Sequence, residues 1–447
     1  MNISKDIIKS FRTIAVPVAL NNLLISSVSF IDMLMIGQLG ATAISAVGIG
    51  NQVFFLFTLM MFGICSAASV FIAQFRGKKD PESVKKTVVV GLALSSASSL
   101  IFIFLSAVIP GKVMGLFTTD INVIEAGISY LVISAVSYLF SSVTFSYGMM
   151  LRSIEKAKVP LFASVVANFI NIILNYLLIF GIWVFPEMGI KGAALATTIA
   201  RFIESAILVI TVYRNTREIA VSFNDVKKVT REFINKYIRI ALPVVLNEVF
   251  WAAGMTMYKI VYGRIGTNAL AAISINETIL QLMMVLFMGS ANACVVVIGK
   301  SIGEGDLKKT RRYARDFHII GAAAGIITAL LSLNVIFIIP RIFNVPDEVM
   351  KWTVNLILIN AVIFPFKIFN IHNIVGIFRG GGDTKTAFYI EIISVWLIGV
   401  PVAFFTGLYL KLPVYLVFMF INIEEVFKAL ISVKRLVSGK WIHDLTK

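Results

Sequence analysis

Few residues in this sequence are of the types that catalyse reactions or bind transition metals. The two cysteines, Cys65 and Cys294, both lie in apolar runs and are too far apart to form a CxxC pair, so neither a redox motif nor a disulfide framework is indicated. The three histidines, His318, His372 and His443, are widely separated. The sequence also lacks the P-loop, HExxH and GxSxG motifs. An enzyme is therefore not expected.

Charged residues are scarce as well. Only 14% of the residues are charged and 58% are hydrophobic, whereas soluble domains average about 25% charged residues. A soluble protein of this composition would expose large apolar patches. The apolar residues occur in continuous runs of about 20, which is the length of a membrane-spanning helix, and not in the alternating pattern of a β-barrel strand. The predicted fold class is therefore an all-α integral membrane protein.

Twelve apolar stretches are predicted to cross the bilayer as helices. They are residues 14–36, 44–74, 87–109, 125–150, 160–182, 190–213, 238–263, 269–300, 316–339, 350–377, 387–409 and 413–436. The second and eighth stretches are longer than a straight crossing requires, so we expect these helices to tilt or to extend beyond the bilayer.

Basic residues mark one side of the predicted membrane. Of the 40 lysines and arginines, 30 lie in the two termini and in every second loop, whereas the opposite loops hold six. Because basic loops remain on the cytoplasmic side, both termini are predicted to be cytoplasmic in a multi-pass protein of the plasma membrane. The net charge of +16 is thereby explained, and no nucleic-acid partner is expected.

The chain matches itself when it is shifted by 226 residues. The identities include Pro17 with Pro243, Asn21 with Asn247, Gly40 with Gly266, Gly63 with Gly289 and Asp80 with Asp306. Such a match indicates a duplication. It predicts two six-helix lobes that are related by an axis along the membrane normal, around a central cleft. The lobes are predicted at 1–213 and 238–447, with a cytoplasmic linker at 214–237.

An acidic residue, Asp32, lies inside the first predicted span. Its counterpart in the repeat is Tyr258, so the two halves differ here, which points to a task performed by one half only. A charged residue in hydrocarbon is costly and suggests a function, in this case the exchange of a proton or a sodium ion. The alternative is an ion pair with Arg201 that only holds helices together.

Three amides lie on one predicted helix. Asn168, Asn171 and Asn175 are spaced i, i+3 and i+7 in the fifth span, so they share one face of that helix. Amide oxygens can bind a hard cation, or the amides can hydrogen-bond a neighbouring helix. The spacing alone leaves both interpretations open.

Two prolines lie inside predicted spans at equivalent positions of the repeat, Pro17 in the first span and Pro243 in the seventh. A proline within a helix removes a backbone hydrogen bond and kinks the helix. Each proline is therefore predicted to be either a hinge or an inherited packing kink.

Further charged residues lie in the predicted spans. Glu248 and Glu277 are secondary functional candidates in the second lobe. Arg201 and Glu204 are three residues apart and are expected to neutralise each other. The remaining charged residues are expected to be structural, to pair with one another or to reach the membrane surface: Lys259, Lys367, Glu391, Glu424, Glu425 and Lys428.

Several short motifs occur in order along the whole chain. They are Phe30-Ile31-Asp32, Gly37-Gln38-Leu39-Gly40, Ala73-Gln74-Phe75-Arg76-Gly77, Gly192-Ala193-Ala194-Leu195-Ala196-Thr197 and Arg379-Gly380-Gly381-Gly382-Asp383-Thr384-Lys385. In these motifs the sequence resembles the multidrug and toxic compound extrusion (MATE) family of cation-coupled exporters. The resemblance implies a cation site between the first, fifth and sixth spans, as in archaeal relatives.

Carried over to this sequence, that site consists of Asp32, Asn171, Asn175 and Thr197. Relatives often have aspartate where Asn175 stands, so the site here has one carboxylate fewer. The coupling ion can accordingly be H⁺, or Na⁺ bound at Asp32, Asn171 and Asn175.

The predicted function is a secondary active antiporter that exports organic cations or amphipathic drugs by alternating access, in exchange for H⁺ or Na⁺. No other cofactor is expected, and a monomer in the bilayer is. One rival is a lipid-linked oligosaccharide flippase, which would need several arginines to hold pyrophosphate, whereas Arg201 is the only arginine deep within a span. The other rival is a membrane-embedded enzyme, for which no catalytic cluster is present.

Overall fold

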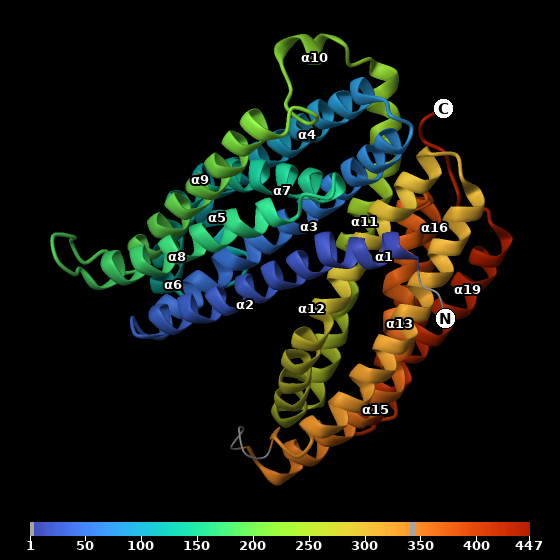
Figure 1. Cartoon of the computed structure of the whole chain (residues 1–447). Helices are drawn as coiled ribbons and strands as arrows, with labels where there is room; N and C mark the ends of the chain where they lie inside the picture. The colour runs from blue at the N-terminus through green and yellow to red at the C-terminus, as the bar shows by residue number, and fades with distance from the viewer. Residues whose placement is uncertain (1–3, 340–344) are drawn as a thin grey trace. The chain divides into compact units, whose positions relative to one another are not determined.

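The computed structural model describes residues 4–339 and 345–447, and within these ranges every regular element is a helix. The first half of the chain forms α1 (Lys5–Ser10), the π-helical turn η1 (Phe11–Ala15), α2 (Val16–Gly37), α3 (Ala41–Gly77), α4 (Pro81–Ala107), α5 (Pro110–Gly115), α6 (Ile121–Ala135), α7 (Ser137–Ser153), α8 (Lys158–Phe180), α9 (Ile190–Asn215) and α10 (Phe223–Lys227). Figure 1 shows the course of the chain through these helices.

The second half begins with two long helices and ends in a series of shorter segments. These elements are α11 (Arg231–Ile265), α12 (Thr267–Gly303), α13 (Leu307–Val335), α15 (Asp347–Ile371), η2 (His372–Phe378), α16 (Thr384–Ile392), η3 (Ile393–Gly399), α17 (Val400–Phe404), η4 (Phe405–Tyr409), α18 (Val414–Ile421) and α19 (Ile423–Ser438). The segments η2, η3 and η4 are π-helical turns, and turns of this kind occur mostly as local insertions in α-helices, often at functional sites.

Among the described residues, nine helices are long and apolar enough to span a membrane, and the number rises to 11 if each of two bent pairs counts as one span. The bent pairs are α6 with α7, at 50°, and the two parts of α12, at 42°. These spans correspond to the first eleven predicted stretches. The predicted twelfth, 413–436, coincides with α18 and α19, where three charged residues, Glu424, Glu425 and Lys428, interrupt the apolar sequence. The all-helical membrane fold is confirmed, and the twelfth crossing stays a prediction.

The duplication is visible in the local structure. The helices α3 and α12 both have 37 residues and begin 226 residues apart. Each is preceded by a glycine with positive φ, Gly40 at 97° and Gly266 at 150°. The next helices are capped in the same way, since Asp80 accepts a bond from the Ser83 N–H at 3.0 Å and Asp306 accepts one from the Lys309 N–H at 2.9 Å. Both halves therefore start with the same helix–turn–helix unit, which confirms the predicted repeat.

By compactness the chain divides into two units, one formed by Leu20–Val245 and the other by Met1–Ala19 together with Leu246–Lys447. The chain passes from one unit to the other two residues after Pro17, within α2, and again two residues after Pro243, within α11. The turn η1 directly precedes Pro17's helix, whereas Pro243 lies inside a continuous α-helix. The two prolines thus mark equivalent points of passage, and their role as hinges stays a prediction.

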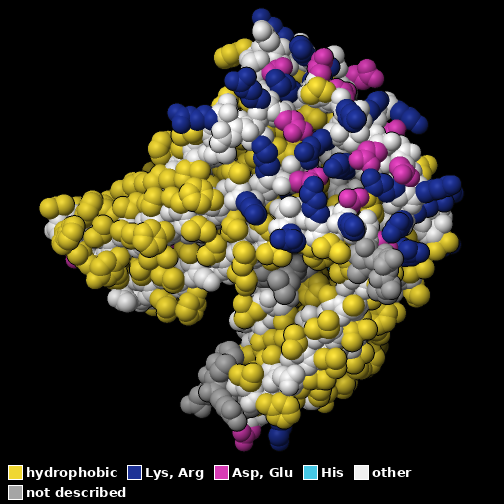
Figure 2. All heavy atoms as spheres, in the orientation of Figure 1, with side chains coloured by type: hydrophobic (Ala, Val, Ile, Leu, Met, Phe, Trp, Pro, Cys, Tyr) yellow, Lys and Arg dark blue, Asp and Glu magenta, His cyan; other side chains and the backbone are white. Residues whose placement is uncertain are grey.

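Each unit separates apolar from basic surface. In Figure 2 apolar side chains cover the flanks of the long helices, whereas lysines and arginines gather at one end of the helices. In the unit Leu20–Val245 this basic end lies near α10, and in the other unit it lies near the C-terminus. A belt of apolar surface bounded by basic ends is what a bilayer requires of a spanning bundle.

Candidate functional site

The predicted partners of Asp32 lie beside it in the structure. Asp32 is on α2, and Figure 1 shows this helix running beside α8, which carries Asn171 and Asn175. The Asn175 side chain donates to the Asp32 carboxylate at 2.7 Å and to the Asn171 carbonyl oxygen at 3.3 Å. Asn171 and Asn175 are buried, at 5% and 1% exposure. The spacing of the asparagines thus placed two amides correctly against the only acidic residue of α2.

A tight hairpin fixes the remaining part of the site. The helices α8 and α9 are joined by a turn in which the Met188 N–H donates to the Leu178 carbonyl at 2.9 Å. A Cβ atom at Gly192 would lie 2.5 Å from that carbonyl oxygen, so the close approach of the two helices requires glycine. This contact sets α9 against α8 and brings Thr197 and Arg201 to the polar face of α8.

These side chains surround a cavity of about 340 Å³, which lies entirely within the unit Leu20–Val245. Asp32, Asn175, Thr197 and Arg201 line its polar side. A smaller hollow of about 40 Å³ adjoins it and is lined by Asp32, Thr197 and Arg201 together with Asn168 and Asn171. The structure therefore brings together all four predicted coupling residues. Whether they bind the coupling ion stays a prediction.

One atom of this cluster lacks a partner. The Asn175 Oδ1 atom is buried and accepts no hydrogen bond from the described residues. A buried polar atom without a partner is costly, and a carbonyl oxygen beside a carboxylate is a suitable ligand for a hard cation. Asn168 differs, because its side chain donates to Ser164 at 3.3 Å on the same helix.

Arg201 pairs with Glu204, as the sequence predicts. The guanidinium Nη1 donates to the Glu204 Oε2 at 2.7 Å. Asp32 and Arg201 line the same cavity but form no ion pair with each other. The simple alternative, in which Arg201 neutralises Asp32 directly, is therefore not the arrangement found.

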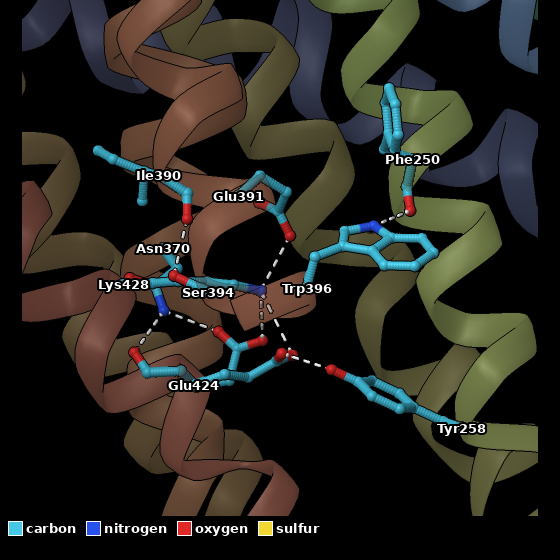
Figure 3. A network of polar contacts seen from close by, with 10 residues as sticks. Phe250, Tyr258, Asn370, Ile390, Glu391, Ser394, Trp396, Glu424 and Lys428 are labelled. Atoms are coloured by element: carbon cyan, nitrogen blue, oxygen red, sulfur yellow. Dashed lines mark hydrogen bonds and ion pairs between the residues drawn. The ribbon is translucent and has the colours of Figure 1, made fainter. Parts of the chain in front are cut away.

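A second polar cluster lies in the other unit, and sequence reasoning treated its members as structural. Lys428 on α19 contacts three carboxylates, those of Glu391 at 2.9 Å, Glu425 at 3.4 Å and Glu424 at 3.5 Å. Figure 3 shows these groups pointing toward the Lys428 ammonium from α16 and α19. Lys428 is only 3% exposed and Glu424 4%. Three carboxylates thus share one lysine inside the helix bundle.

The cluster extends through neutral side chains. The Tyr258 hydroxyl donates to Glu424 at 2.6 Å, and the Asn370 amide donates to Glu425 at 2.7 Å (Figure 3). Glycine at position 399 allows this approach, because a Cβ atom there would overlap the Tyr258 hydroxyl and the Glu424 carboxylate. The signal in the sequence was the placement of Glu424 and Glu425 four and three residues before Lys428, which puts them on one helix face.

The two secondary candidates of the second half are both paired with basic residues. Glu248 on α11 accepts from Arg379 at 2.7 Å, and the Arg379 side chain is only 2% exposed. Glu277 on α12 lies 3.0 Å from the ammonium of Lys259, and this pair is about half exposed. Their functional role stays a prediction.

An α-helical membrane protein with two repeated halves, and with a polar cavity inside one of them, has the architecture of a secondary transporter. This chain belongs to the MatE family of membrane transporters, because the family model matches residues 17–177 and 243–405, one segment in each half. The family assignment confirms that the protein is a transporter and not an enzyme. Transporters of this family use cation gradients.

Relatives match over almost the whole chain. The "Probable multidrug resistance protein YoeA" of Bacillus subtilis is 27% identical over 91% of this chain and 88% of its own length. The "Probable multidrug resistance protein NorM" of Thermotoga maritima is 26% identical over 98% of this chain and 93% of its own length. The bent form of the MATE transporter VcmN from Vibrio cholerae is similar in structure, with a TM-score of 0.88, 17% identity and 99% coverage of both chains.

Proposed function

We propose that this chain is a cation-coupled antiporter that exports organic cations or other amphipathic compounds by alternating access. The observation that carries the proposal is the pairing of Asp32 with Asn175 at the wall of the cavity. A carboxylate at a cavity wall can exchange its bound cation with water, whereas a carboxylate sealed in an ion pair cannot do so readily. The names of the relatives, which refer to multidrug resistance, support amphipathic drugs as the exported compounds.

Asp32 serves as the coupling group and the asparagine amides orient it. Asp32 is the only acidic side chain that lines either hollow. When Asp32 binds a proton or a sodium ion, the charge that attracts a cationic substrate is removed. Substrate and coupling cation thus compete for one carboxylate, and this competition is the basis of antiport.

Of the two possible coupling ions we favour the proton. One carboxylate suffices to bind and release a proton, whereas a sodium ion needs several oxygen ligands. Asn171, Asn175 and Thr197 offer only neutral oxygens to complete such a shell, and a site with a single negative charge would have to be well shaped to hold sodium.

The test is efflux of a fluorescent organic cation from proteoliposomes under separately imposed proton and sodium gradients. We expect a pH gradient at constant sodium to drive efflux. Efflux that requires sodium at fixed pH and ignores a pH gradient would transfer the coupling role to sodium. Efflux that responds to neither gradient would contradict cation-coupled antiport.

The direction of transport depends on the orientation in the membrane. We propose that both termini and the segment that contains α10 are cytoplasmic, on the basis of the distribution of basic residues. Single cysteines in place of Lys228, next to α10, and Met188, in the turn between α8 and α9, should react with impermeant reagents from opposite sides. The native Cys65 and Cys294 are buried and leave a low background. Labelling of both positions from one side would contradict this topology.

A further inference from the structure

The cavity in the unit Leu20–Val245 presents charged groups of both signs to the same space. The Asp32 carboxylate and the Arg201 guanidinium both line it. They form no ion pair with each other, since Arg201 pairs with Glu204 along its own helix. The Glu204 side chain is 7% exposed, whereas the Arg201 side chain is 26% exposed. The guanidinium therefore neutralises Glu204 on one side and faces the cavity on the other.

Arg201 retains the capacity to bind an additional anion. A guanidinium carries five N–H donors, and its described hydrogen bond to a side chain is the one from Nη1 to Glu204. The remaining donors can form the bidentate contact that arginine makes with a carboxylate. A lysine at this position would offer only a point charge.

The cavity is too large to serve a coupling ion alone. Its volume of about 340 Å³ falls in the range of about 300–1,000 Å³ that is typical of small-molecule sites. Its other walls carry four aromatic rings, those of Phe54, Phe55, Tyr130 and Tyr138. Rings of this kind bury an apolar or aromatic body and also attract cations.

We propose that this cavity binds amphipathic zwitterions, with the cationic group of the ligand at Asp32, its carboxylate at Arg201 and its apolar body against the aromatic rings. The proposal rests on the proposed export function and specifies its substrate class. Arg201 is then the residue that determines specificity, because it adds molecules with a carboxylate to the organic cations that Asp32 alone would select. A purely cationic ligand would leave the guanidinium uncompensated and close to its own positive charge.

Two fluorescent probes that differ only in the carboxylate test this directly. They are Nε-dansyl-L-lysine, a zwitterion, and monodansylcadaverine, the same molecule without its α-carboxylate. Binding to the purified full-length protein is measured by dansyl fluorescence, without any ion gradient. We expect the wild type to bind the zwitterion about tenfold or more tightly than the cation. Equal binding, or a preference for the cation, would refute the proposal.

The variant Arg201→Leu should remove this preference. Its affinity for dansyl-lysine should fall about tenfold or more, whereas its affinity for dansylcadaverine should stay the same or rise. Because Arg201→Leu leaves Glu204 without its partner, the double variant Arg201→Leu/Glu204→Leu is measured alongside and should show the same loss of preference. Lys259→Met, which removes a cation from the other half, is the matched control and should keep the preference. An equal loss of both ligands in the double variant, with an unchanged unfolding temperature, would reduce Arg201 to a structural residue.

The proposal and the export function can fail separately. If Arg201→Leu leaves ligand preference unchanged while Asp32→Asn abolishes gradient-driven export, the zwitterion proposal is wrong and the function stands. If the preference depends on Arg201 but no gradient drives export, the cavity binds zwitterions in a protein that is not an antiporter of the proposed kind.

Discussion

The two repeated halves treat the same position in opposite ways. In the first half, Asp32 accepts a hydrogen bond from an asparagine at the wall of a cavity. In the second half, the equivalent Tyr258 donates a hydrogen bond to Glu424, inside a buried cluster of three carboxylates and Lys428. One half thus presents its carboxylate from the first helix of the repeat, and the other half holds its carboxylates on its last helices, with a cation built in.

This difference separates exchange from cohesion. A carboxylate beside open space can release and rebind a mobile cation, whereas carboxylates that contact a fixed lysine are already compensated. Burying such a cluster is expensive, and its partners must all remain in place for the cost to be offset. We therefore expect changes in the first half to affect transport most and changes in the second half to affect stability most.

Asp32→Asn should have the largest effect on function. The variant keeps the size of the side chain and its contact with Asn175 but removes the only carboxylate at the cavity, so gradient-driven efflux should be abolished. The measurement is efflux from proteoliposomes, with the unfolding temperature and membrane insertion as controls. Efflux at the wild-type level would make Asp32 a packing residue and would remove the contrast between the halves.

Lys428→Met should have the largest effect on stability. It leaves Glu391, Glu424 and Glu425 buried without their shared cation, and breaking a buried ion pair from one side costs about 3–5 kcal/mol. Thermal unfolding in detergent should show a marked decrease of the transition temperature. The control Lys259→Met removes a lysine whose side chain is 56% exposed, and such pairs contribute about 0–1 kcal/mol. Equal effects of the two variants would show that the cluster is not the compact ionic core that we infer.

Gly399→Ala probes how closely the same cluster is packed. The added methyl group would overlap the Tyr258 hydroxyl and the Glu424 carboxylate, and overpacking of this kind typically costs about 1–3 kcal/mol. The variant Gly399→Ala/Tyr258→Phe removes the hydroxyl and should recover part of the loss. An alanine variant as stable as the wild type would mean that the Tyr258–Glu424 contact is looser than 2.6 Å.

The sequence predicted the first-half site because the information there is local. Three asparagines at helical spacing and one acidic residue in an apolar run identify a polar helix face without knowledge of the tertiary structure. The second-half cluster was not predicted as a unit, because Tyr258, Asn370, Glu391 and Glu424 come from four different helices. Only the short spacing between Glu424 and Lys428 was available from the sequence, and it is also common in ordinary surface helices.

The spans were predicted better than their irregularities. The predicted span 160–182 differs from α8, Lys158–Phe180, by two residues at each end. The bend between α6 and α7 was missed, because neither proline nor glycine marks it. At the bend the Ser137 hydroxyl donates to the Ser134 carbonyl at 2.6 Å, and serines that bond to nearby backbone compete with the helical pattern and often bend helices.

Asn175→Ala should have the smallest effect on transport and is the most informative about the ion. The change removes a donor to Asp32 and a free carbonyl oxygen at once. With proton coupling, export should continue, and its pH profile should move toward higher pH, because Asp32 loses a hydrogen bond that favours its charged form. With sodium coupling, the loss of an oxygen ligand should instead raise the sodium concentration for half-maximal efflux strongly. Asn168→Ala is the control, since Asn168 bonds to Ser164, and it should leave both profiles unchanged. A strong sodium effect without a pH shift would contradict proton coupling, and it would make the first-half cluster a metal-ion site in which Asn175 is a direct ligand.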